Sequence, residues 1–296
     1  MSKPIALVGI GKIARDQHIP AIHADPDWSL AATVSRNASV EGIENYPTLD
    51  ALLAARPDID TVSLAIPVQP RFEHARLAIE AGRHVMLEKP PGVSVAECLN
   101  LQVLAQRQGV SLYATWHARH AEGIAEARDW LAGRRLRSLR ISWKEDVRVW
   151  HPGQEWVWEP GGLGVFDPGI NALSILTSVL PEPVHLNAAT LDVPENRQTP
   201  IAASLSFQHS AGACVEAEFD WRLVGDPEWQ IMIETDDGSR VLSFGAASMD
   251  IEYRRLYQRM AELVVDGTMD MDLSPLMHVA DAFMLGRRRH TDPFFF

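Results

Sequence analysis

The chain of 296 residues is 46% hydrophobic and 22% charged, which excludes extensive disorder and leaves room for two folded domains. With 27 Lys and Arg against 39 Asp and Glu, its net charge is -12, so nucleic acid and anionic membranes are not expected as partners. Cys98 and Cys214 form no close-spaced pair, which excludes a disulfide framework and a cysteine-based zinc site, and we expect no metal. No apolar run is long enough for a signal peptide or a membrane span, and we expect a cytoplasmic protein.

In chain order, the first 120 residues alternate short apolar strands with helices. Strands are expected at 5–8, 30–34, 61–66, 84–87 and 111–115, and helices at 13–24, 49–55, 72–80 and 95–108. Pro20 is expected to interrupt the first helix. Strands that are almost wholly apolar are typical of a parallel sheet with both faces buried. The sequence therefore predicts an α/β domain over residues 1–119.

The pattern changes after residue 120. A helix at 122–132 is followed by longer strands with alternating polar and apolar residues, expected at 139–147, 201–208, 213–222, 230–235 and 240–243. Such alternation is typical of an antiparallel sheet with one buried face. Residues 120–296 are therefore expected to form a second domain with a largely antiparallel sheet. The basic run at 287–290 is expected to close its last helix.

A glycine motif follows the first strand. Residues 9–14 read G-x-G-x-x-A between an apolar strand and a helix. The first glycine of such a motif permits a tight turn, and the second lets the backbone approach a pyrophosphate at the helix N-terminus. We therefore expect Gly9, Gly11, Lys12 and Ile13 to bind a dinucleotide. The alternative is a glycine turn without a ligand, which the strand and helix on either side make less favourable.

The end of the second strand indicates which dinucleotide is bound. An NAD-specific site places Asp or Glu about 20 residues after the glycine motif, to bind the ribose diol. Here the strand runs into Ser35, Arg36 and Asn37, and Arg36 suits a 2′-phosphate. We expect NADP to be preferred and NAD to be usable, with Ser35 and Arg36 as contacts. The alternative is that Arg36 is an ordinary solvated surface residue.

A lysine follows the strand at 84–87, in the sequence Glu88-Lys89-Pro90. Ligands of open parallel sheets lie beyond the carboxyl ends of the strands, so Lys89 is placed to reach a substrate. Its ammonium would stabilise charge developing on a substrate oxygen. Taken alone, a lysine at a strand end is usually a surface charge. The Lys89–Pro90 peptide bond is expected to be cis, because only prolyl bonds adopt that form cheaply.

These motifs together resemble the glucose–fructose oxidoreductase / inositol dehydrogenase (Gfo/Idh/MocA) family, and the resemblance covers the whole chain. It rests on the glycine motif, on residues 65–67 (Ala-Ile-Pro), on residues 74–90 and on residues 161–171, which are similar to a G-G-x-x-x-D-x-G-x-H motif. The family implies a Rossmann domain, then an α/β domain with a large, open, mostly antiparallel sheet. It also implies hydride transfer between a nicotinamide and a sugar or cyclitol carbon. Further cofactor contacts implied by the resemblance are Ala65, Ile66, Pro67, His74, Glu88 and Lys89.

The resemblance also implies three catalytic residues. Lys89 matches the catalytic lysine of the family, and Asp167 matches its substrate-binding aspartate. Asn171 stands where the family usually has histidine. An amide cannot accept the substrate proton, so Lys89, Asp167 or a relayed water is left to do so. With Ser35-Arg36, Asn171 resembles the bacterial aldose 1-dehydrogenases that act on D-galactose and L-arabinose and form lactones.

Sugar recognition is expected mainly in the second domain. Sugar rings present C–H faces that suit tryptophan, and the chain has 9 Trp against 4 Tyr. With Asp167 and Asn171, the candidates for substrate contacts are His117, Glu145, Trp150 and Trp229. For Trp150 and Trp229 a place in the core is an equal alternative.

Other functions and the assembly stay open at this point. The alternatives are another sugar or inositol dehydrogenase or reductase of the family, and a non-catalytic NADP-sensing protein. An open sheet face favours a homo-oligomer, either a dimer or a tetramer.

Overall fold

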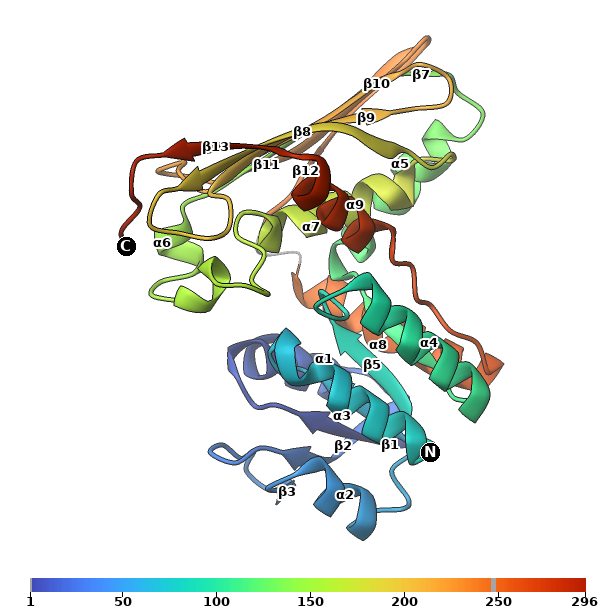
Figure 1. Ribbon diagram of the computed structural model, residues 1–296. Coiled ribbons are helices and arrows are strands. Elements are labelled where there is room, and N and C mark those ends of the chain that lie inside the picture. The colour runs from blue at the N-terminus through green and yellow to red at the C-terminus, as the bar shows by residue number, and fades with distance from the viewer. Residues whose placement is uncertain (1, 246–248) are drawn as a thin grey trace. The chain divides into compact units, whose positions relative to one another are not determined.

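The chain folds into two compact units. The computed structural model describes residues 2–245 and 249–296 (Figure 1). The first unit is Met1–His120 with Met249–Leu273, and the second is Ala121–Ser248 with Ser274–Phe296. The division expected from the sequence, 1–119 and 120–296, differs in one respect. It keeps residues 249–273 in the second domain, whereas in the structure this segment packs in the first unit.

The first unit is built on a parallel six-stranded sheet with the order β3-β2-β1-β4-β5-β6. Its strands are β1 (Lys3–Val8), β2 (Trp28–Val34), β3 (Glu44–Tyr46), β4 (Thr61–Leu64), β5 (His84–Glu88) and β6 (Leu112–Thr115). The strand order reverses between β1 and β4, which is where open sheets of this kind bind ligands. The predicted Rossmann-type parallel sheet is confirmed. The short edge strand β3 was not expected, because it has no apolar run.

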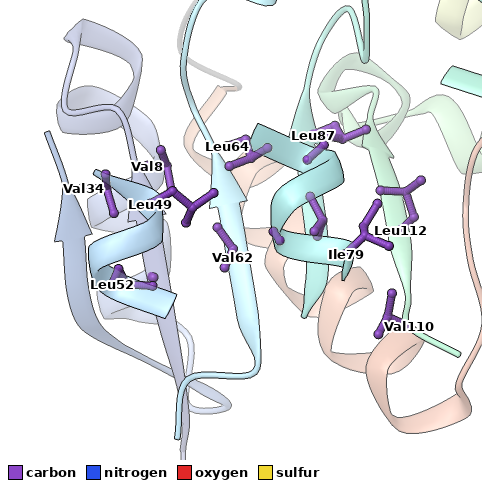
Figure 2. Close-up of a cluster of buried hydrophobic side chains, with 14 of the residues drawn as sticks. Val8, Val34, Leu49, Leu52, Val62, Leu64, Ile79, Leu87, Val110 and Leu112 are labelled. Atoms are coloured by element: carbon purple, nitrogen blue, oxygen red, sulfur yellow. The ribbon is translucent and has the colours of Figure 1, made fainter. Parts of the chain in front are cut away.

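Helices cover both faces of this sheet. On one face lie α2 (Leu49–Ala55), α3 (Val68–Glu80) and α4 (Val95–Gln108), and on the other lie η1 (Ala14–His18), α1 (Ile19–Ala24) and α8 (Met249–Asp266). Figure 2 shows the hydrophobic core between the sheet and α2, α3 and α4, where Val8, Leu64 and Leu87 of the strands meet Leu49 and Ile79 of the helices. Apart from the exposed edge strand β3, the strands are thus buried on both faces, which is why their sequences are almost wholly apolar.

The expected interruption of the first helix at Pro20 is wrong. The helix continues from residue 12 to residue 24, and Ala14–His18 within it is a π-helical turn. Proline lacks an N–H and its ring crowds the carbonyl four residues before it. Pro20 follows directly on the wider π-helical turn, at the start of α1. The π-helical hydrogen bonds before Pro20 span five residues instead of four, and the helix continues past the proline.

The second unit contains a seven-stranded sheet with the order β12-β11-β7-β10-β9-β8-β13. Its strands are β7 (Leu136–Lys144), β8 (His185–Pro194), β9 (Ala202–Gln208), β10 (Cys214–Asp220), β11 (Glu228–Thr235), β12 (Gly238–Ser243) and β13 (Arg287–Thr291). Only the pairs β7–β10 and β8–β13 are parallel. The expectation of a large, mostly antiparallel sheet is therefore confirmed. One face carries α5 (Ile124–Leu131), α7 (Phe166–Val179) and α9 (Ser274–Leu285) (Figure 1).

The basic run near the C-terminus was expected to close the last helix, and this is wrong. Helix α9 ends at Leu285, and the run forms the edge strand β13 beside β8. Arg289 donates both Nε and Nη2 to the carboxylate of Asp192 in β8, each at 2.7 Å. A bidentate ion pair and pairing with β8 hold this segment in the sheet, although its sequence lacks the alternation of polar and apolar residues typical of a strand. In the described part of the chain, no helix combines the length and the apolarity needed to cross a membrane.

Candidate active site

The glycine motif forms a turn at the carboxyl end of β1. Gly9 has a φ of +91°, and a Cβ there would lie 2.7 Å from both Ala65 O and Ile66 Cγ2 at the end of β4. Only glycine fits so close an approach of the two strand ends. A Cβ on Gly11 would meet nothing within 4 Å. The turn therefore leaves open space beside Gly11 at the start of a helix, and this arrangement fits a pyrophosphate.

Four other residues expected to bind the cofactor lie in or directly before two helices of the first unit. Lys12 begins the helix of residues 12–24 and forms an exposed ion pair with Asp16 one turn later. Ile13 follows and packs against the core. Pro67 is the N-cap of α3, with extended backbone at ψ 151°. His74 lies further along α3, where its Nδ1 is 2.8 Å from the carbonyl oxygen of Pro70.

The end of β2 lies beside the glycine turn. Gly9 N donates to Val34 O at 2.9 Å, and Ser35 N donates to Tyr46 O at 3.0 Å. This fixes the backbone of Ser35, and Arg36 is exposed at the next position. A second cation, not expected from the sequence, reaches the same loop, since Arg15 donates to the carbonyl oxygen of Ser39 at 3.2 Å. Two guanidinium groups on one loop fit an anion such as a 2′-phosphate.

At the end of β5, the carboxylate of Glu88 is buried among protein donors. It accepts hydrogen bonds from Lys89 N at 2.7 Å and from Tyr253 Oη at 2.5 Å, and His18 Nε2 lies 3.1 Å away. Burial opposes ionisation, but the hydrogen bond and charge of His18 outweigh it and lower the pKa of Glu88 to about 2. The carboxylate, expected at the cofactor, is thus an anion held inside the first unit.

Lys89 follows on a rigid piece of backbone. The Lys89–Pro90 peptide bond is cis, as expected. The buried guanidinium of Arg71 donates to the carbonyl oxygens of Glu88, Pro90 and Ile66. One side chain therefore ties the residues on both sides of Lys89 to the end of β4, and the direction in which the lysine leaves the sheet is fixed.

His117, expected to contact the substrate, lies in a buried cluster of the first unit. It belongs to the short 3-10 helix η2 (His117–His120) after β6 and is 7% exposed. Its Nδ1 is 2.6 Å from Glu252 Oε2, and its ring stacks on Tyr253 with centroids 5.4 Å apart. Both partners come from α8. In this unit His117 therefore contacts the residues that surround Glu88.

In the second unit, three of the residues expected to contact a sugar are brought together. Glu145 follows β7 and is 2% exposed. It accepts from Trp229 Nε1 at 2.9 Å and from Trp221 Nε1 at 3.3 Å. The ring of Trp150, in the short helix α6 (Val147–Trp150), packs on Trp229 at 5.0 Å, and Trp143 stacks on the same ring at 5.7 Å. A buried carboxylate thus orients a group of indole rings.

Asp167 and Asn171 project from the first turns of α7, four residues apart and therefore on one face. Gly169 lets α7 lie close to β10, because a Cβ there would be 3.2 Å from the ring of Phe219. Asp167 is 7% exposed, and its Oδ2 is 3.5 Å from His151 Nε2. The Oδ1 of Asn171 is buried and accepts no hydrogen bond from the described residues. A ligand hydroxyl would satisfy it.

His151 was not expected from the sequence as a site residue. Besides Asp167, it contacts Trp221, with ring centroids 5.2 Å apart, and its Nδ1 is 3.3 Å from Gln154 Oε1. It therefore joins the carboxylate on α7 to the indole group around Glu145. The one signal in the sequence is its position directly after Trp150, which places it in the same loop.

The two units offer complementary chemistry. The first offers a glycine turn, two guanidinium groups and a lysine at a strand end, a set that suits a dinucleotide and a polarised substrate oxygen. The second offers a carboxylate, an amide, an imidazole and indole faces, a set that suits a polyhydroxylated ring. Within residues 2–245 and 249–296, no three His, Cys, Asp or Glu side chains are grouped to hold a metal ion.

Known proteins share these features. Residues 3–115 match the family described as "Oxidoreductase family, NAD-binding Rossmann fold". The chain is 42% identical to galactose 1-dehydrogenase of Pseudomonas fluorescens over 98% of both chains. The crystal structure of D-galactose-1-dehydrogenase from Rhizobium etli is 50% identical, with a TM-score of 0.96 over 100% of this chain and 99% of that one. GenD2 from gentamicin A biosynthesis, solved with NAD, is 21% identical with a TM-score of 0.82 over 96% and 92%, and shares the fold. The chain therefore belongs to the Gfo/Idh/MocA family of NAD-binding oxidoreductases.

Proposed function

We propose that the protein is an aldose 1-dehydrogenase that oxidises the anomeric carbon of D-galactose or L-arabinose to the aldonolactone and prefers NADP to NAD. The observation that carries this proposal is the likeness, over the whole chain, to galactose 1-dehydrogenases at 42% and 50% identity. The polar and aromatic set of the second unit supports it, because its groups match those that bind a sugar ring.

Sugar binding falls to the second unit. Trp150 is 36% exposed and Trp229 is half-buried, so their faces are available to the C–H groups of a sugar ring. Glu145 holds the ring of Trp229 in place through its Nε1–H. Asp167 and Asn171 bind hydroxyl groups, and the amide of Asn171 does so without taking a proton.

The reaction removes a hydride from C1 and a proton from O1 of a cyclic hemiacetal, and a C1=O double bond forms. When bound, the nicotinamide accepts the hydride. Lys89 donates a hydrogen bond to O1 and stabilises the charge that develops there. Asp167 accepts the O1 proton directly or through a water, and His151 beside it shares that proton. Lys89 as the proton acceptor is the alternative, and it needs an uncharged lysine, which is rare at neutral pH.

The preference for NADP follows from charge at the end of β2. Arg36 is exposed directly after Ser35, and Arg15 reaches the same loop. No carboxylate follows β2 at residues 35–37 to bind a ribose diol. A 2′-phosphate would gain charge-assisted hydrogen bonds here that a hydroxyl does not make.

The test is the appearance of reduced nicotinamide, followed by absorbance, on mixing the protein with NADP and single sugars. We expect a signal with D-galactose or L-arabinose and none with myo-inositol. A signal only with inositol would favour the alternative dehydrogenase. Tight NADP binding without turnover of any sugar would favour a sensor. The Lys89→Ala variant is the control, since it should bind NADP and lose turnover.

We also propose that the face of the second sheet opposite α7 and α9 joins copies of this chain. Its exposed side chains pair across strands, with Arg140 Nε 3.7 Å from Glu216 Oε2 and Lys144 Nζ 3.1 Å from Glu218 Oε2. Alternating charges of both signs allow such a face to pair with itself. Sedimentation of the protein is expected to show a dimer or a tetramer, and a monomer at micromolar concentration would refute the proposal.

A further inference from the structure

Glu88 lies at the centre of a buried set of polar side chains drawn from four parts of the first unit. His18 comes from η1, Tyr253 and Tyr257 from α8, Ser63 from β4 and Glu88 itself from the end of β5. Few sites in a protein interior hold so many polar groups, because each one must be satisfied by a partner. Here the hydrogen bonds form a connected chain that ends at the backbone of Lys89.

The connections can be followed atom by atom. Tyr257 Oη lies 2.7 Å from His18 Nδ1 and donates to Ser63 Oγ at 3.3 Å. His18 therefore bridges the Tyr257 hydroxyl and the Glu88 carboxylate through its two ring nitrogens, since its Nε2 lies 3.1 Å from Glu88 Oε1. Tyr253 donates to the same carboxylate oxygen as His18, Oε1, at 2.5 Å. The other oxygen, Oε2, accepts from Lys89 N.

The chain of contacts lies within an otherwise apolar cluster. The buried hydrophobic cluster on this face of the sheet includes Tyr253, Tyr257, Met86 and Leu7. A buried anion at a strand end costs free energy unless several donors compensate it. The structure supplies those donors and directs one carboxylate oxygen at a single amide, that of the proposed catalytic lysine.

We propose that Tyr253 and His18 are positioning residues of the active site, which act through Glu88 on the backbone of Lys89 and so fix where its ammonium meets the substrate oxygen. This inference rests on the proposed function for its catalytic consequence. Neither residue needs to touch the sugar. A displacement of about 1 Å in a reacting group costs up to roughly 10²-fold in rate, so a positioning contact is measurable in turnover.

Tyr253→Phe removes one donor to Glu88 and keeps the ring that packs in the core. We expect kcat to fall roughly 10- to 100-fold, while the KM for sugar and the affinity for NADP stay near those of the wild type. His18→Leu removes the other side-chain donor and should have the same effect. Tyr113→Phe is the matched control. It deletes a buried hydroxyl of the same unit that bonds His120, at 3.0 Å, instead of Glu88, and its kcat should equal that of the wild type.

A second readout needs no substrate. The chain has four lysines, Lys3, Lys12, Lys89 and Lys144, so a sample labelled with ¹⁵N-lysine gives four backbone amide signals, and Lys89→Arg identifies one of them. Tyr253→Phe and His18→Leu should shift the Lys89 signal and speed its exchange with water, and should leave the other three unchanged. Tyr113→Phe should change none of them.

The acid titration of the Lys89 signal reports the ionisation of Glu88. The titratable and charged groups that face Glu88 are His18, His117, Tyr253, Tyr257 and Arg71. Because the pKa of Glu88 is lowered to about 2, the wild-type signal should show no inflection between about pH 3.5 and pH 5, where an ordinary glutamate titrates. Loss of His18 or Tyr253 should move the titration upward and bring an inflection into this range.

The outcomes separate the two proposals. An unchanged Lys89 signal in both variants overturns the positioning role, whatever the activity. A shifted signal with kcat equal to that of Tyr113→Phe also overturns it, because the contact would then be structural. If the wild type turns over no sugar, the proposed function fails while the Lys89 signals still decide whether Tyr253 and His18 hold this amide.

Discussion

Trp229→Phe is the sharpest test of the sugar site, because it removes the indole N–H that bonds Glu145 and keeps an aromatic ring. Trp229 Nε1 donates to Glu145 Oε2 at 2.9 Å, and Glu145 is 2% exposed. A hydrogen bond to a buried charged group contributes about 1.5–3 kcal/mol. Phenylalanine retains the contact with Trp143 and lacks the donor, so the carboxylate keeps the weaker bond from Trp221 at 3.3 Å.

Two measurements follow from this loss. If the loss of this hydrogen bond weakens sugar binding by the full amount, kcat/KM should fall by roughly 10- to 150-fold, mainly through a higher KM. The part lost from the folded protein should lower Tm at roughly 2–4 °C per kcal/mol. Trp143→Phe is the matched control. It replaces the indole that stacks on Trp229 with a smaller ring and leaves the hydrogen bonds from Trp229 and Trp221 to Glu145 in place. Equal values of KM for the two variants would refute the assignment of Trp229 to the sugar site.

Further predictions concern the cofactor, the proton and acid stability. Arg36→Ala should weaken NADP binding by about 1–3 kcal/mol and leave NAD binding nearly unchanged; equal losses in a fluorescence titration would show that Arg36 does not bind the 2′-phosphate. Lys89→Ala should lower kcat at least ~10²-fold, and stopped-flow turnover at the wild-type rate would contradict its role. Asp167→Asn should impair both kcat and the KM for sugar, whereas an effect on KM alone would mean that Asp167 takes no proton. The pKa of Glu88 lies near 2 instead of 4.5, so its ionisation stabilises the fold above about pH 4.5 by about 3 kcal/mol, and this contribution is lost as the pH falls toward 2. Urea unfolding of Glu88→Gln between these pH values should therefore show a weaker dependence on acid than the wild type.

The parts of the fold that the sequence predicts are those with local causes. Strand β1 and the turn at Gly9 follow from an apolar run and from a backbone conformation that only glycine adopts freely. Strand β13 has neither cause. It is held by Arg289 against Asp192, a pair 97 residues apart, and no local pattern announces such a contact. Helix α8 was not expected, and its buried face meets a sheet formed by residues far earlier in the chain.

The same distinction applies to the candidate site. Glu145 and Trp229 were each expected as sugar contacts, because carboxylates and indoles are residue types that suit a sugar, but their pairing was not expected. His151 was missed, since its contact with Asp167 depends on how the loop after α6 folds back on α7. The buried partners of Glu88 were missed for a similar reason. Tyr253 lies 165 residues further along the chain, and its role appears only when α8 is placed.

The return of α8 to the first unit bears on how the chain folds during synthesis. The sheet of this unit is complete at residue 115, but η1 and α1 cover only part of one face, and side chains of residues 249–264 cover the rest. A ribosome adding 5–20 residues per second needs roughly 10–30 s to supply them. During that interval part of an apolar sheet face remains exposed to water and to other nascent chains. Residues 1–120 alone are therefore expected to aggregate, and the nascent first unit to need a chaperone until α8 has emerged.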